Sequence, residues 1–189
     1  MLAAIALLVP ACRGGDKSEA GPTATVPRAP ATTTTTNPYA VPEVIDKAYV
    51  ERVLAGLDGV VGDIVRLVIA TRGIPQDAVD RVKAVYLDRE GQNLELASLS
   101  HSFREGFRGF RENPGNKRST VKNLIVATPT CVFVQVERDY SQVGIQQNSK
   151  PSTEWIVLKP LDPNQDPQAY NPTPWAFATE GVEPPAHPC

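Results

Sequence analysis

The stretch VKNLIVATPTCVFVQVERD, residues 121–139, decides the fold. Its two halves, 121–127 and 131–139, are rich in β-branched residues that alternate with other side chains, which is the pattern of a β-strand. Thr128, Pro129 and Thr130 separate the halves, and a short break of this kind between two strand patterns is typical of a hairpin. We therefore expect these two segments to pair as antiparallel strands.

Two further segments downstream have strand character. TEWIVLK (153–159) and WAFAT (175–179) are apolar and rich in aromatic or β-branched residues, and the polar stretch 141–152 predicts a loop before them. The sheet should therefore have about four antiparallel strands. We expect helices to cover either the face that bears Phe133, Trp155 and Phe177 or the opposite face.

Helical periodicity fills the chain before the hairpin. Apolar residues recur at helical spacing over 43–72, over 75–90 and over a third segment that ends near Asn113. The third segment places Phe103, Phe107 and Phe110 on one stripe, which predicts a core-facing surface. Helices followed by strands define the α+β class, so we predict N-terminal helices packed on the antiparallel sheet.

Composition limits the class of function. The chain has 189 residues, 41% hydrophobic, with a formal net charge of −2, which predicts one globular domain with extra segments and argues against a nucleic-acid binder. Six of the 18 prolines lie in residues 1–42, three in 43–150 and nine in 151–189. Because proline fixes φ and lacks an amide donor, the regular core should begin near residue 42.

The N-terminal segment resembles the start of a bacterial lipoprotein. Residues 2–9 are apolar, and Val9-Pro10-Ala11-Cys12 is similar to a lipobox, in which the cysteine becomes the lipidated first residue. We interpret 1–11 as a signal peptide, incomplete because no Lys or Arg precedes the apolar run. Residues 12–41 follow as the lipidated cysteine and a disordered Thr/Pro-rich linker, and 42–189 as a single domain with a Pro-rich tail.

This resemblance predicts where the protein acts. Acyl chains such as palmitate on Cys12 would anchor the domain to the cell membrane, facing outward, where its partner would be another envelope or membrane protein. If Cys12 carries lipid, Cys131 and Cys189 remain as a pair in an oxidising compartment, and we expect a disulfide between them. The alternative is a buried Cys131 and a free terminal thiol.

A basic segment covers the end of the third predicted helix and the residues that follow it. Between residues 101 and 122, six Lys or Arg residues face two acids, a local net charge of +4. A possible basic interaction surface comprises Arg104, Arg108, Arg111, Lys117 and Arg118. Such a surface would attract anionic headgroups or an acidic partner, whereas the simpler interpretation is a solvated helix edge.

The sequence shows no catalytic constellation. His101 is the one histidine of the domain before the Pro-rich tail, and no second set of His, Cys or acidic residues stands at metal-ligand spacing near it. No nucleophile-elbow pattern accompanies this histidine either. We therefore expect no metal and no cofactor, and we lean towards a non-catalytic protein.

The order of elements over residues 42–180, with the Trp-bearing strand TEWIVL, resembles the NTF2-like or SnoaL-like cone fold and uncharacterised lipoproteins of actinobacteria. Three predicted helices precede any strand here, whereas those folds usually place a strand between the second and third helices. The resemblance implies a pocket, whose nearest candidate residues are His101, Asp139 and Tyr140.

Two hypotheses result. The first is a lipid-anchored extracytoplasmic accessory or interaction domain without catalysis. The alternative is a small-molecule-binding protein or enzyme of the NTF2-like/SnoaL-like type. An apolar pocket with converging polar groups would favour the alternative, and a filled core with an exposed patch would favour the first.

Overall fold

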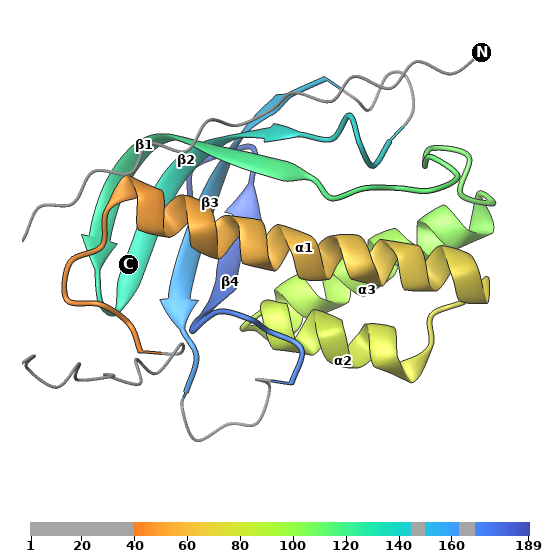
Figure 1. Cartoon of the computed structure of the whole chain (residues 1–189), viewed down its shortest axis with the longest axis horizontal. Helices are drawn as coiled ribbons and strands as arrows, with labels where there is room; N and C mark the ends of the chain where they lie inside the picture. Colours follow the sequence, from red (N-terminus) through yellow and green to blue (C-terminus); the bar gives the residue numbers. More distant parts are fainter. Residues whose placement is uncertain (1–39, 145–149, 163–168) are drawn as a thin grey trace, which may run out of the picture. The chain divides into compact units, whose positions relative to one another are not determined.

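The computed structural model describes residues 40–144, 150–162 and 169–189, which form three helices and a four-stranded antiparallel sheet (Figure 1). The predicted signal peptide, Cys12 and nearly all of the predicted linker lie outside the described residues. The elements are α1 (Lys47–Thr71), α2 (Gln76–Val85), α3 (Arg89–Arg104), β1 (Arg118–Thr128), β2 (Cys131–Asp139), β3 (Ser152–Pro160) and β4 (Trp175–Gly181). The predicted α+β class is confirmed.

Helices α1 and α3 begin at aspartate caps that the periodicity did not locate. Helix α1 begins after Asp46, whose side chain accepts a hydrogen bond from the Tyr49 amide at 2.7 Å, and not at residue 43 as predicted. Helix α2 ends at Val85, and α3 starts after Asp88, which accepts from the Gly91 amide at 2.6 Å. The break between α2 and α3 therefore precedes Gly91, although Gly91 was the predicted stop.

Helix α3 ends nine residues before the predicted breaker at Asn113. Gly106 and Phe107 have φ values of 65° and 55°, in the left-handed region, which terminates the helix after Arg104. The predicted helical stripe of Phe103, Phe107 and Phe110 is therefore wrong. Phe103 is 43% exposed, whereas Phe107 and Phe110 lie beyond the helix and still pack against the main core, as predicted for core-facing residues. The Phe107 ring contacts each of the other two edge to face.

The sheet is a simple meander in the order β1-β2-β3-β4. Helix α1 packs against β1, and α2 and α3 pack against β4, so all three helices cover one face (Figure 1). The strand residues that are buried against the helices are Val121, Val132, Val134, Val136, Ile156, Leu158, Trp175 and Phe177. The main core therefore lies between this face and the helices.

The opposite face carries a second, smaller apolar cluster. Phe133 and Trp155 stack there with ring centroids 5.5 Å apart, next to Cys131 and Val157. The prediction that Phe133, Trp155 and Phe177 share one face is wrong, because Phe177 packs against the helices. Cross-strand register explains this: Phe133 pairs with Val157, whereas Phe177 pairs with Leu158, and adjacent strand residues point to opposite faces.

A disulfide joins Cys131 at the start of β2 to Cys189, with the two Cα atoms 6.0 Å apart. The predicted pairing is confirmed. The bridge ties the Pro-rich C-terminal segment to the second cluster, and it spans 58 residues of chain. None of the helices in the described ranges is long and apolar enough to cross a membrane.

Replacing Cys189 with Ala should lower the free energy of unfolding by about 4 kcal/mol, because the bridge restricts a long loop in the unfolded chain. Urea titration followed by tryptophan fluorescence measures the change. A reductant should bring the unmodified protein to the stability of the variant and leave the variant unaffected. Equal stability of the unmodified protein with and without reductant would contradict this role.

Candidate functional site

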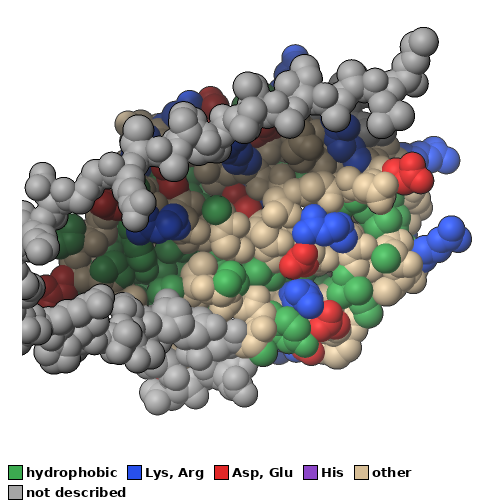
Figure 2. Space-filling model, viewed as in Figure 1, with side chains coloured by type: hydrophobic (Ala, Val, Ile, Leu, Met, Phe, Trp, Pro, Cys, Tyr) green, Lys and Arg blue, Asp and Glu red, His purple; other side chains and the backbone are tan. Residues whose placement is uncertain are grey.

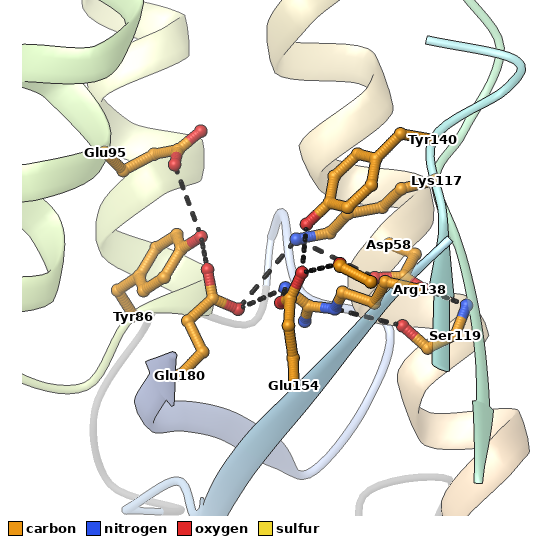
Figure 3. A network of polar contacts seen from close by, with 10 residues as sticks. Asp58, Tyr86, Glu95, Lys117, Ser119, Arg138, Tyr140, Glu154 and Glu180 are labelled. Carbon is orange, nitrogen blue, oxygen red and sulfur yellow. Dashed lines mark hydrogen bonds and ion pairs between the residues drawn. The ribbon is translucent and has the colours of Figure 1, made fainter. Parts of the chain in front are cut away.

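A buried network of ionised side chains crosses the interface between the helices and the sheet (Figure 3). Its members come from every layer: Asp58 lies in α1, Lys117 precedes β1, Arg138 lies in β2, Glu154 in β3 and Glu180 in β4. Alternation along β2 places Arg138 after Val132, Val134 and Val136 on the face that the helices cover.

Arg138 is the centre of this network. It is 1% exposed, and its Nη1 atom lies 3.0 Å from Glu154 Oε2 and 2.9 Å from Glu180 Oε2. Its Nε atom donates to Ser119 Oγ at 3.3 Å. Burial alone lowers the pKa of the guanidinium, but the surrounding carboxylates outweigh burial and raise the pKa, so Arg138 stays charged.

Lys117 links the network to α1. Its Nζ atom lies 4.0 Å from Asp58 Oδ1 and 3.9 Å from Glu180 Oε2, and its side chain is buried. Asp58 Oδ2 also accepts a hydrogen bond from the Ser119 amide at 3.0 Å. Burial raises the pKa of Asp58, although Lys117 and Arg138 act in the opposite direction.

The network continues to α3 through a tyrosine. Tyr86 donates from its hydroxyl to Glu180 Oε1 at 2.9 Å, and Glu95 Oε2 lies 3.5 Å from the same hydroxyl. Burial disfavours ionisation of Glu180, but Lys117 and Arg138 outweigh it and lower the pKa of this carboxyl to about 2. Burial dominates at Glu95 and raises its pKa.

Tyr140 closes the other end of the network. Its hydroxyl donates to Glu154 Oε1 at 2.9 Å, and Ser152 Oγ donates to the same oxygen at 2.6 Å. Burial raises the pKa of the Tyr140 hydroxyl, so this group acts as a neutral hydrogen-bond donor.

A groove of about 510 Å³ opens above this network. Its apolar walls come from α1, α3 and the loops that follow α3 and β2, and they comprise Val61, Val65, Leu99, Phe107, Phe110 and Val143. Its polar lining includes Glu95, Lys117, Tyr140 and Glu180. The two loops hold each other in place, since the Arg111 amide donates to the Val143 carbonyl at 2.9 Å. The groove therefore combines apolar walls with an ionised floor.

The structure brings together two of the three predicted pocket residues. His101 and Tyr140 both line the groove, with His101 exposed and Tyr140 half-buried. Asp139 is not part of the lining. Its Oδ1 atom instead accepts from the Ser141 amide at 2.8 Å, and this hydrogen bond lowers the pKa of Asp139.

The predicted basic surface is only partly exposed. Arg104, Arg108, Arg111 and Arg118 are exposed, and Arg108 also lines the groove. Lys117 does not belong to this surface, because it is buried against Asp58 and Glu180. Elsewhere, acidic and basic side chains are interspersed over the helices (Figure 2), as in the Arg66–Asp63 and Arg81–Asp77 pairs.

Most of the network was missed from the sequence. Asp58, Tyr86, Glu95, Arg138, Glu154 and Glu180 were not candidates, although two of them carried a usable signal. Arg138 continues the inward-facing series of β2, and Asp58 lies beside Leu54, Leu57 and Val61 in the apolar pattern of α1. A charged residue at a core position predicts a buried partner of opposite charge.

Within the described residues, no group of three or more His, Cys, Asp or Glu side chains is arranged to hold a metal ion. Comparison with known proteins finds no matching family model, no similar curated protein and no similar solved structure. We therefore infer the function from the contacts of the groove and its network.

The network should make stability depend on pH in two opposite ways. Glu180 has its pKa lowered from 4.5 to about 2, so its contribution is complete above pH 4.5 and is lost as the pH falls towards 2. Asp58 and Glu95 have raised pKa values, so protonating them stabilises the folded state as the pH falls towards their ordinary values.

Glu180→Gln should therefore lower the free energy of unfolding at pH 7 by about 3 kcal/mol, because it leaves Arg138 and Lys117 with too few anions. It should also flatten the loss of stability between pH 4.5 and 2 in urea titrations. Glu137→Gln is the control: Glu137 pairs with Lys122 at the surface, and its loss should cost less than about 1 kcal/mol. Equal effects of the two substitutions would contradict the role of the network.

Proposed function

We propose that this domain binds a small molecule in the groove between α1 and α3, at the outer face of a cell membrane. The observation that carries the proposal is the groove itself, since apolar walls that end on a few fixed polar groups are typical of ligand sites. The accessory role predicted from the sequence rested on the lipobox-like segment and on the absence of a catalytic constellation, and an apolar pocket with converging polar groups was the observation expected to favour the alternative. The groove therefore favours the alternative, a ligand-binding protein. The proposal includes a cone-like fold of the NTF2-like or SnoaL-like type.

The chemistry of the floor favours binding over catalysis. Glu180 has a pKa of about 2 and burial raises the pKa of Tyr140, so neither of these two groups exchanges a proton readily near neutral pH. Lys117 is held between Asp58 and Glu180. Groups fixed in this way orient a ligand by hydrogen bonds and charge.

Two observations support the location. The Cys12 segment is similar to a lipobox, and the Cys131–Cys189 disulfide is of the kind that persists in oxidising compartments. Together they support a lipid-anchored, extracytoplasmic domain. The protein would then meet its ligand outside the cytoplasm.

Ser98→Trp tests the groove. Ser98 is an exposed residue of α3 that lines the groove, so an indole there should fill it and weaken binding of the neutral fluorophore N-phenyl-1-naphthylamine at least tenfold. Ala97→Trp is the matched control, because Ala97 is also exposed on α3 but does not line the groove. Fluorescence titration measures both. Equal binding by the two variants, or no binding by the unmodified protein, would overturn ligand binding in this groove.

Cys12→Ser tests the anchor. Cells that are fed an alkyne fatty acid should label the unmodified protein and release the Ser variant from the membrane fraction in unlabelled form. The control is Cys189→Ser, which should keep the label. Unlabelled protein in the unmodified strain would reject lipidation.

A further inference from the structure

Glu95 stands out in the groove because it forms no ion pair with any residue that the structure describes. Burial raises its pKa, although Lys117 and Arg138 lower it from a distance. Three of the four carboxylates in this region have an ion pair: Asp58 with Lys117, Glu154 with Arg138, and Glu180 with both cations. No ion pair joins Glu95 to a cation among the residues that the structure describes. Its polar contact is the Tyr86 hydroxyl at 3.5 Å, and that hydroxyl already donates to Glu180 at 2.9 Å.

The charge around Glu95 is also unbalanced. A second cavity of about 410 Å³ shares Glu95 and Glu180 with the groove, and its other charged lining residues are Asp88 and Glu90. Glu105 adds another carboxylate to the groove lining. Against these, the groove offers Lys117, which is already paired, and the exposed Arg108.

A ligand with a positive charge would supply the missing partner. An ammonium group at Glu95 would give this half-buried carboxylate a partner of opposite charge, whereas a carboxylate ligand there would add to the like charges of Glu95 and Glu180. The apolar walls contributed by Val61, Val65 and Leu99 would cover a hydrocarbon body.

We propose that the groove takes an alkylamine, with its hydrocarbon chain against α1 and α3 and its ammonium group on the Glu95 carboxylate. This inference rests on the proposed ligand binding and names the class of ligand. The charged and titratable groups that face Glu95 are Tyr86, Glu180, Lys117 and, at longer range, Arg138. Because Glu95 has no ion pair of its own among the described residues, it can accept the ammonium while Glu180 keeps its ion pairs with Lys117 and Arg138. Figure 3 shows this separation, with Glu95 on α3 apart from the Lys117 and Arg138 pairs.

The test compares octylammonium, octanol and octanoate, which share a chain and differ in head group. Isothermal titration calorimetry at pH 7 with the full chain should show at least tenfold tighter binding of octylammonium than of the other two. Glu95→Gln should remove this preference, whereas Glu137→Gln should keep it, because Glu137 pairs with Lys122 at the surface and lines neither cavity. Thermal unfolding of both variants checks that they fold.

A second readout uses the unmodified chain. Since burial raises the pKa of Glu95 above its ordinary value of 4.5, binding of a cation at pH 5 should release protons from this carboxyl, and the release should become smaller as the pH rises. Titrations in two buffers of different ionisation enthalpy measure it. A lysophosphatidylethanolamine of similar chain length identifies the source: tighter binding than octylammonium indicates a membrane lipid, and weaker binding indicates a free amine.

The outcomes separate this inference from the proposed function. Equal binding of the three octyl compounds, or an equal loss in Glu95→Gln and Glu137→Gln, would overturn the alkylamine and leave ligand binding in place. Binding of the neutral fluorophore without any binding of octylammonium would do the same. Absence of binding by the fluorophore and by all three compounds would overturn both.

Discussion

The buried guanidinium of Arg138 constrains the rest of the structure. Removing such a group from water costs several kcal/mol unless anions with good geometry surround it. The fold supplies them from separate elements: Glu154 from β3 and Glu180 from β4 lie about one hydrogen-bond length away, and Asp58 from α1 adds to the field. The relative placement of three strands and a helix is therefore tied to one charged side chain.

This arrangement also determines what the groove presents. Arg138 and Lys117 draw Asp58, Glu154 and Glu180 towards the middle of the domain, where the carboxylates stabilise them. Glu95, on α3, forms no ion pair with these two cations and faces the groove. The same interactions that hold the helices on the sheet thus leave one half-buried carboxylate with a weak partner, which is a common origin of selectivity in a binding site.

The opposite face of the sheet depends on a different constraint. Its cluster around Phe133 and Trp155 is small, and no helix of the described chain covers it. The Cys131–Cys189 bridge fastens the C-terminal segment at this cluster. A covalent link here compensates for the limited apolar area that this side of the sheet can bury.

Local patterns in the sequence determined the strands, the α+β class and the Cys131–Cys189 pair, because β-branched alternation and cysteine number are properties of short segments or of composition. They could not locate the end of α3, since the phenylalanine spacing continues beyond the left-handed turn at Gly106 and Phe107. They also placed Phe133 and Phe177 on one face, which is incorrect, because the face of a residue depends on its register with a neighbouring strand.

For the site, the sequence identified His101 and Tyr140, which line the groove, but it assigned the buried Lys117 to the surface. The assembly of the network and the position of Glu95 beside it depend on the tertiary structure alone. The residues of the network are far apart in the chain and become partners only when the helices pack on the sheet.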